Sequence, residues 1–205
     1  MIGGDLSGIQ SYLFDLNHEH SRGAAKTLRA RSFKIKMLCD MVLQRICREL
    51  SLPRQCVLMN AGGKFMLLAP HTQAVTDYLE MLKPETEQEF FGQFEGAISL
   101  NLDWQTPICF RDLMMNNFPD TLDRFIHNLE KAKLRKHSSY LLRDSAWQCK
   151  NFLINQQSYY SKLCTQCGKK TVESPEEICE SCYQEIKLGE IIPKTQALHH
   201  PQGSS

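Results

Sequence analysis

The sequence predicts an α+β protein, in which a four-stranded antiparallel sheet with helices on one side is followed by a helical domain containing a four-cysteine zinc module. Two observations predict the sheet domain: short apolar runs alternate with segments of helical periodicity, and a glycine pair separates two of the runs. A third observation, two Cys-x-x-Cys pairs near the end of the chain, predicts the zinc module. We expect the domains to comprise residues 1–106 and 107–205.

The elements of the first domain follow from local patterns. Residues 1–10 predict a strand that runs into a glycine-punctuated turn, and residues 24–50 keep their apolar side chains on one helical face. Two short apolar runs around the turn at residues 60–63 predict a hairpin. The further elements are a helix at 72–82, more helix or an acidic loop at 85–94, and an alternating strand at 97–102.

In chain order these elements read βαββαβ. This is the split βαβ pattern of the ferredoxin-like fold, which the palm of polymerases and nucleotidyl cyclases uses. The pattern changes after Pro107, since residues 111–142 are mostly helical and residues from about 149 to 182 form the cysteine module. We expect a polar loop at 17–22 and a tail from residue 189.

The cysteine spacing carries the strongest chemical signal. Each Cys-x-x-Cys turn presents two thiolates to one ion, and two such turns complete the tetrahedral sulfur shell that zinc prefers. The alternative is a redox-active cysteine pair or a chance pattern, but neither accounts for two Cys-x-x-Cys pairs at the spacing of zinc ligands. A closed four-cysteine site leaves no open coordination position, so the zinc is expected to be structural. The expected ligands are Cys164, Cys167, Cys179 and Cys182.

Composition excludes several classes of protein. Of 205 residues, 42% are hydrophobic and 23% are charged, which excludes a disordered or collagen-like chain. The formal net charge of +1 provides no global attraction to nucleic acid. No apolar run is long enough to span a bilayer, and no secretory signal opens the chain. With nine cysteines, an odd number, we expect a reducing cytoplasm and no membrane.

A second group of residues pairs the end of the first strand with the hairpin turn. In a ferredoxin-like sheet these two places are neighbours, so Asp5 is expected near Gly62 and Gly63. Glycines let backbone N–H groups approach a phosphate, and Ser7, beside Gly8, adds a hydroxyl. The alternative is that these are ordinary turn glycines with a capping Asp-x-Ser, and the sequence leaves both interpretations open.

The same region argues against catalysis by this domain. Two-metal nucleotidyl transfer requires at least two carboxylates to hold the ions. Here Lys64 follows the glycine pair where a palm cyclase needs an acid, so Asp5 alone cannot build such a site. Lys64 is expected either to pair with a phosphate or to be a solvated strand lysine.

A basic stretch at residues 22–36 contains six lysines and arginines and no acid. Lying at the start of the long helix, it could contact a phosphate or an RNA backbone. The alternative is a solvated helix face balanced by the acidic stretch at residues 80–95, and both remain open.

Together these motifs resemble the large subunit of type III CRISPR effector complexes in its Csm (III-A) form. The resemblance rests on five segments in the right order and extends from the first residue to about Leu198. They are residues 4–10, residues 24–33, residues 62–65, the four-cysteine module and residues 191–194.

The resemblance implies that the first domain is the first of two Palm domains and is non-catalytic. In that family an HD nuclease domain cuts single-stranded DNA, and a second Palm with a Gly-Gly-Asp-Asp motif makes cyclic oligoadenylate from ATP when target RNA is bound. Neither motif occurs in this sequence, so we expect a portion of the subunit that is inactive alone. By the same resemblance, the residues lining the ATP pocket between the Palms are Asp5, Ser7, Gly8, Gly62 and Gly63.

The resemblance also implies cofactors and partners. Beside the structural zinc, ATP and a divalent metal are expected only in the complete two-Palm assembly. The expected partners are the other effector subunits, the second Palm, the CRISPR RNA and the target RNA. The predicted function is therefore an ATP-binding, non-catalytic half of a cyclic oligoadenylate synthase in antiviral defence. The alternative is a zinc-stabilised scaffold that docks other subunits or RNA and binds no nucleotide.

Overall fold

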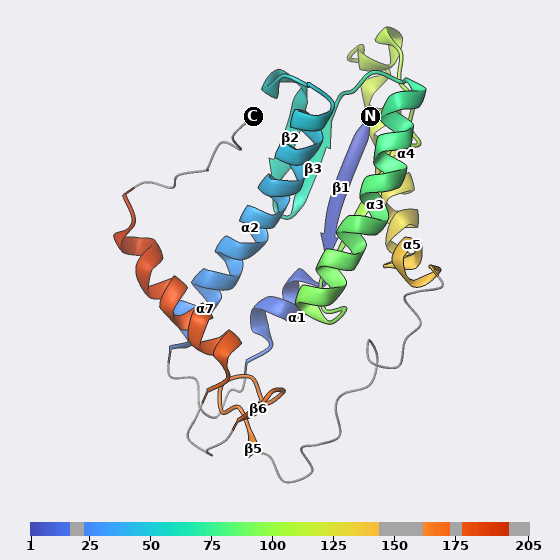
Figure 1. The fold of residues 1–205 in the computed structure, drawn as a ribbon. Helices are drawn as coiled ribbons and strands as arrows, with labels where there is room; N and C mark the ends of the chain where they lie inside the picture. The colour runs from blue at the N-terminus through green and yellow to red at the C-terminus, as the bar shows by residue number, and fades with distance from the viewer. Residues whose placement is uncertain (17–22, 144–161, 173–177, 197–205) are drawn as a thin grey trace. The chain divides into compact units, whose positions relative to one another are not determined.

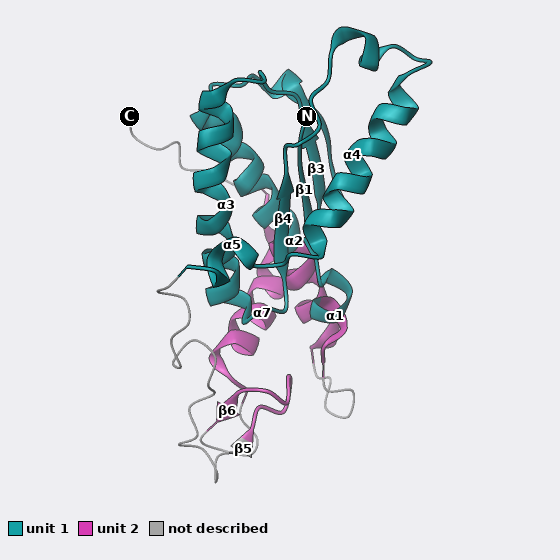
Figure 2. Ribbon diagram, turned by 90° about the vertical axis from the view of Figure 1, so that its right-hand side faces the viewer, with its two compact units in different colours: residues 1–12, 35–155 teal, residues 13–34, 156–205 magenta. Residues whose placement is uncertain are grey.

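The structure is a computed structural model that describes residues 1–16, 23–143, 162–172 and 178–196. The expected loop at 17–22, the start of the cysteine module at 149–161 and the end of the tail lie outside these residues. The chain forms two compact units (Figure 2). Unit 1 comprises residues 1–12 and 35–155, and unit 2 comprises residues 13–34 and 156–205. The expected boundary at 106/107 therefore stays a prediction, because these units intermingle along the sequence.

Unit 1 is built on a four-stranded antiparallel sheet with the order β2-β3-β1-β4 (Figure 1). This order and the chain sequence of the elements confirm the predicted ferredoxin-like arrangement. Gly62 and Gly63 form the two-residue turn between β2 and β3, and both have positive φ, as the tight turns of twisted hairpins require. The strands are β1 (Ile2–Ser7), β2 (Val57–Ala61), β3 (Lys64–Leu67) and β4 (Ser99–Asp103).

The helices of unit 1 cover both faces of this sheet. Helix α3 (Gln73–Phe94) lies on one side of the strands in Figure 2, and α4 (Phe118–Lys133) lies on the other. The apolar face that packs with α3 includes Phe65, Leu100 and Leu102, all buried. On the opposite face, Phe125 of α4 lies so close to Gly3 that a side chain there would clash with its ring. A side chain larger than hydrogen at position 3 would therefore require the Phe125 ring to move.

Three helical elements differ in detail from the expectation. Residues 73–94 form one continuous helix, so the stretch at 85–94 is helix and not an acidic loop, although Pro84 lies inside it. Thr72 caps its start by accepting a hydrogen bond from the Val75 N–H. A short helix, α1 (Ile9–Phe14), follows β1 where we predicted no helix. The predicted helical stretch after residue 111 comprises η3 (Phe110–Leu113), α4 and α5 (Ser138–Leu141).

Helix α2 (Ala24–Glu49) agrees with the predicted long helix and contributes to both units. Its second part belongs to unit 1, where Ile35, Cys39, Val42 and Ile46 are buried at helical spacing. Its first part belongs to unit 2, together with the hairpin of β5 (Lys162–Leu163) and β6 (Thr171–Val172) and with helix α7 (Glu180–Ile191). Among the described residues, no helix is both long and apolar enough to cross a membrane.

Candidate zinc centre and nucleotide-binding wall

The four predicted zinc ligands come together in unit 2. The sulfur atoms of Cys164, Cys167, Cys179 and Cys182 all lie within 4.8 Å of one another. In a tetrahedron with Zn–S bonds of about 2.3 Å, neighbouring sulfurs are about 3.8 Å apart. The distance of 3.9 Å between Cys167 and Cys179 fits this geometry. The thiols are therefore arranged for one tetrahedral metal ion, and they are the one such group of three or more side chains in the part of the chain that the structure describes.

Different elements position the two cysteine pairs. The first pair lies in the β5–β6 hairpin, where the Gly168 N–H donates to the Cys164 carbonyl at 2.8 Å and Gly168 adopts a φ of +66°. The second pair opens helix α7, with Cys179 immediately before its first residue. The start of a helix favours negative charge and therefore thiolates. The Cys179 N–H also donates to the Cys164 sulfur at 3.2 Å, which joins the two pairs.

Without metal, the thiols share protons unequally. A hydrogen bond from the Cys182 thiol lowers the pKa of Cys167 to about 4, and the same contact raises the pKa of Cys182. Zinc would displace the remaining protons, because it binds thiolates. The site would hold zinc structurally, since the four sulfurs close its coordination shell.

The second predicted site lies at one end of the sheet in unit 1. Asp5 is the register partner of Lys64, and the Leu6 N–H donates to the Gly63 carbonyl at 2.8 Å. The expected proximity of Asp5 to the glycine turn is thus confirmed. Ser7 lies on the same face as Asp5, and Gly8 follows at the end of the strand. This end of the sheet, made of Asp5, Ser7, Gly8, Gly62 and Gly63, is called the glycine wall below.

Backbone geometry explains two of the three wall glycines without any ligand. Gly8 has a φ of +88°, and a Cβ there would lie 2.0 Å from the carbonyl oxygen of Ala97. Gly63 has a φ of +84°, and a Cβ would lie 2.4 Å from the side chain of Ile9. Gly62, by contrast, faces open space with a φ of +62°. A backbone contact therefore requires glycine at position 8, whereas at position 63 the positive φ favours glycine and the end of the Ile9 side chain would have to move. Of the three, only Gly62 leaves room for an approaching group.

Asp5 is buried and neutralised by two lysines. Its Oδ2 atom lies 3.2 Å from the Lys64 Nζ and 2.8 Å from the Lys133 Nζ. Burial lowers the pKa of Lys133, but hydrogen bonds to Asp5 and Glu130 outweigh it and raise the pKa above its ordinary value. Two ammonium groups already compensate the charge of this carboxylate, so a divalent cation bound at the same oxygen would have to displace them. Lys64 is half-exposed, so it is both a partner of Asp5 and accessible from solvent.

Sequence reasoning missed two polar residues of the wall. The Asn101 amide donates to the Asp5 carbonyl and to the Ser7 hydroxyl, each at 2.9 Å. The alternation of Leu100 and Leu102 in β4 could have placed Asn101 on the Asp5 face. No local signal could have found Lys133, because it belongs to a helix that reaches the sheet only through the tertiary fold.

The basic stretch at the start of α2 has partners within unit 2. Arg31 is buried and its Nε lies 2.8 Å from Glu185 of α7, and the Lys34 Nζ lies 3.4 Å from the same carboxylate. Lys26 pairs with Glu190, and Arg29 donates to the carbonyl of Gly189 at 2.8 Å. These cations are therefore balanced by α7, and not by residues 80–95 as the solvated-face alternative supposed.

Comparison with known proteins gives a consistent result. A family profile described as Csm1 subunit domain B matches residues 1–148. The chain is 27% identical over 207 residues to the CRISPR system single-strand-specific deoxyribonuclease Cas10/Csm1 (subtype III-A) of Thermococcus onnurineus, covering 95% of this chain and 25% of the relative. It is 31% identical over 110 residues to the protein of that name from Mycobacterium tuberculosis, covering 54% and 13%. The chain thus spans about a quarter or less of the length of these relatives.

Solved structures agree with the sequence matches. The crystal structure of a Csm1–Csm4 cassette in complex with cA4 matches with a TM-score of 0.60 and 30% identity, covering 67% of this chain and 19% of the other. A Csm1–Csm4 cassette in complex with AMPPNP matches with a TM-score of 0.59, the same identity and the same coverage.

Proposed function

Because this chain belongs to the Csm1 family through its domain B, we propose that it is the nucleotide-binding, non-catalytic half of a two-Palm cyclic oligoadenylate synthase in a type III-A CRISPR effector complex. One observation carries the proposal: β1 and the glycine hairpin meet at one end of a ferredoxin-like sheet. The related Csm1–Csm4 cassettes, 30% identical to this chain, are described in complex with AMPPNP and with one ATP. We carry nucleotide binding from those proteins to this chain as part of the proposal.

The wall offers a hydroxyl and an ammonium group to a phosphate. Because the Ser7 hydroxyl accepts the Asn101 amide proton, its own hydrogen remains to be donated to a phosphate oxygen. Lys64 can exchange Asp5 for a phosphate, since Lys133 still neutralises the buried carboxylate. Gly62 leaves open space beside them. These groups bind and orient a nucleotide but hold no metal.

Catalysis therefore depends on a second Palm. The divalent metal that accompanies ATP needs carboxylates, and Asp5 is already paired with two lysines. A Gly-Gly-Asp-Asp portion from the rest of the effector would supply them. Alone, with ATP and magnesium or manganese, the chain makes no oligoadenylate and cuts no DNA. The zinc centre stabilises unit 2 and takes no part in the chemistry.

Calorimetry with AMPPNP tests the proposal. The isolated chain should bind at millimolar Kd or worse, about 4 kcal/mol, because half a pocket has few convergent donors. Addition of the second Palm should tighten binding strongly. In that pair, Ser7→Ala should weaken binding about fivefold, the loss of one hydrogen bond of about 1 kcal/mol. The matched control is Ser32→Ala, an exposed serine of α2.

Gly62→Val is the second arm, because its side chain would enter the open space of the wall without meeting protein atoms. Valine is strained at the φ of +62° of this position, so circular dichroism of the variant checks that the hairpin still folds. Gly63→Val is unsuitable, since the clash with Ile9 would disturb the fold itself. If AMPPNP binds the pair equally well in wild type, Ser7→Ala and Gly62→Val, the wall is not part of the pocket and the scaffold function replaces the proposal.

A scaffold function has one specific observation in its favour. The segment around η3 exposes large apolar side chains: Phe110 is 77% exposed and Met115 is 92% exposed, with Leu113 and Met114 also at the surface. Such a cluster on one loop marks a protein-binding surface. The solved relatives are complexes of Csm1 with Csm4. Phe110→Ser with Met115→Ser should abolish copurification with a Csm4-type subunit if this surface docks it, and should leave nucleotide binding unchanged.

A further inference from the structure

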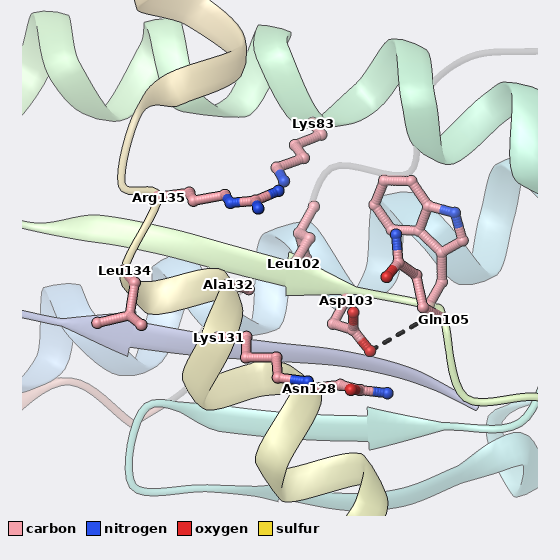
Figure 3. A pocket seen from close by; sticks show the side chains of 10 residues that line it. Lys83, Leu102, Asp103, Gln105, Asn128, Lys131, Ala132, Leu134 and Arg135 are labelled. Atoms are coloured by element: carbon pink, nitrogen blue, oxygen red, sulfur yellow. Dashed lines mark hydrogen bonds between the residues drawn. The ribbon is translucent and has the colours of Figure 1, made fainter.

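A hollow of about 280 Å³ lies along the outer edge of strand β4 (Figure 3). Strand β4 is an edge strand, and its last residues form the floor of the hollow between helix α3 and the end of helix α4. The glycine wall contributes no residue to it. The side chains used in the following argument are Lys83, Asp103, Trp104, Asn128, Lys131 and Arg135.

Cationic side chains line this hollow without an ion pair within 4.0 Å among the described residues. Lys83 of α3 and Arg135, just after α4, extend toward one another in Figure 3, and Lys131 adds a third positive charge to the lining. Among the described residues, no carboxylate lies within 4.0 Å of these three cations. Like charges that point together repel, and an anion between them would relieve this repulsion. The lining therefore favours a negatively charged ligand.

The charge of the hollow matches one phosphate group. Asp103 is the one acid of the lining; it is buried and its Oδ2 accepts the Gln105 N–H at 3.3 Å. Three cations and one carboxylate give a formal charge of +2. A phosphate monoester carries about −1.5 to −2 at neutral pH. The volume of about 280 Å³ lies just below the usual range for ligand pockets, about 300–1,000 Å³, and suits a small ligand.

An aromatic ring and an amide lie beside the cations. The Lys83 Nζ is 6.0 Å from the centre of the Trp104 ring, so the indole lies within reach of the same ligand. The Asn128 Nδ2 donates to Thr106 at 3.0 Å, which leaves its carbonyl oxygen to accept a proton. An indole face stacks on a nucleobase, and cations beside it hold a phosphate. A bare inorganic anion would use only half of this lining.

We propose that the hollow at the edge of β4 binds one nucleotide unit, with its phosphate between Lys83 and Arg135 and its base against Trp104. This site is separate from the glycine wall and does not depend on its function. The unit is either a free mononucleotide or one residue of a single-stranded oligonucleotide, since both present the same base and phosphate.

Tryptophan fluorescence of the full chain tests the proposal. Trp147, the only other tryptophan of the sequence, is replaced by phenylalanine so that the signal comes from Trp104. AMP, adenosine, inorganic phosphate and a six-residue oligoadenylate are titrated separately. AMP should quench the signal saturably, and adenosine and phosphate should each bind at least about tenfold more weakly, since each lacks one contact. Tighter binding of the oligonucleotide than of AMP identifies a single strand as the source; the reverse order identifies a free nucleotide.

Substitution of single cations tests whether the positive charges of the lining contribute to AMP binding. Arg135→Gln should weaken AMP binding at least about fivefold, because a charge-assisted contact is lost. The matched control Lys136→Gln removes a neighbouring exposed cation outside the lining and should have no effect. Ser7→Ala should also leave the signal unchanged, which separates this result from that for the glycine wall. The proposal is overturned if neither AMP nor the oligonucleotide quenches the Trp104 fluorescence at a ligand concentration of about 10 mM, since a specific site should bind more tightly than this. It is also overturned if Arg135→Gln binds AMP as tightly as Lys136→Gln does.

Discussion

The candidate zinc centre and the glycine wall differ in how widely their residues, and the residues that contact them, are separated in the sequence. The four cysteines lie between residues 164 and 182, on one hairpin and the helix that follows it. The glycine wall lies on β1, the residue that follows it and the β2–β3 turn, and it is contacted by Asn101 of β4 and Lys133 of α4. A site made within one short segment can be complete in itself. A site assembled from a sheet end has an open side, and a second domain can share it.

The two sites also use glycine and charge differently. Gly168 serves the turn that presents two ligands, and the thiolates are left for a metal. At the wall, Gly8 and Gly63 allow close contacts within the chain, and the one carboxylate, that of Asp5, forms ion pairs with two lysines. The first site thus has unused metal-binding capacity, whereas the second retains only hydrogen-bond donors.

Removal of one cysteine should have the largest effect. Cys182→Ser breaks the four-sulfur shell, and structural zinc contributes about 10–16 kcal/mol of apparent binding free energy at neutral pH. We expect about one zinc per wild-type chain by elemental analysis and none in the variant. Hydrogen exchange should show loss of protection in α7 and unchanged protection in the sheet. Cys109→Ser, at an exposed cysteine outside the cluster, is the control. Wild-type protein without zinc, purified free of chelators, would refute this centre.

The buried ion pair of unit 2 should come next. Glu185→Gln removes the carboxylate that pairs with the buried Arg31 guanidinium, and breaking a buried ion pair costs about 3–5 kcal/mol. The double change Arg31→Met with Glu185→Met should cost far less, because no charge remains buried. Exchange of the α7 amides measures both, since the units need not unfold together. Equal losses in the single and double variants would show that contacts other than the charge pair hold α7.

The two glycines of the wall offer a matched pair of substitutions. Gly8→Ala introduces a Cβ against the Ala97 carbonyl at a φ of +88°, and about 3 kcal/mol of stability should be lost. Gly62→Ala has a positive φ but free space, and about 1 kcal/mol should be lost. Urea unfolding followed by far-UV circular dichroism compares them. If both variants lose the same unfolding free energy, the positive φ alone, and not the contact with the Ala97 carbonyl, explains why position 8 requires glycine.

Local patterns predicted most of the fold, and tertiary contacts account for what they missed. The strand order followed from the element order, and the clustering of the four cysteines followed from their spacing alone. The prediction left residues 85–94 open between more helix and an acidic loop, and helix α3 continues through them although it contains Pro84, a residue type that normally interrupts a helix. The partners of Arg31 and Asp5 could not be predicted, because Glu185 is 154 residues and Lys133 is 128 residues away in sequence. Long-range charge pairing leaves no periodic trace in the chain.

The two lysines of Asp5 should give the smallest and most discriminating effect. Lys133 has a side chain 23% exposed and Lys64 one 47% exposed, so solvent screens Lys64 more. Lys133→Met should lower the unfolding free energy by about 1 kcal/mol, and Lys64→Met by about 0.5 kcal/mol or less. If Lys64 is instead the phosphate ligand, Lys64→Met should weaken AMPPNP binding in the two-Palm pair about fivefold. Lys133→Met should leave binding within twofold of wild type. The reverse pattern, with stability dependent on Lys64 and binding on Lys133, would place the phosphate on the α4 side of the buried carboxylate.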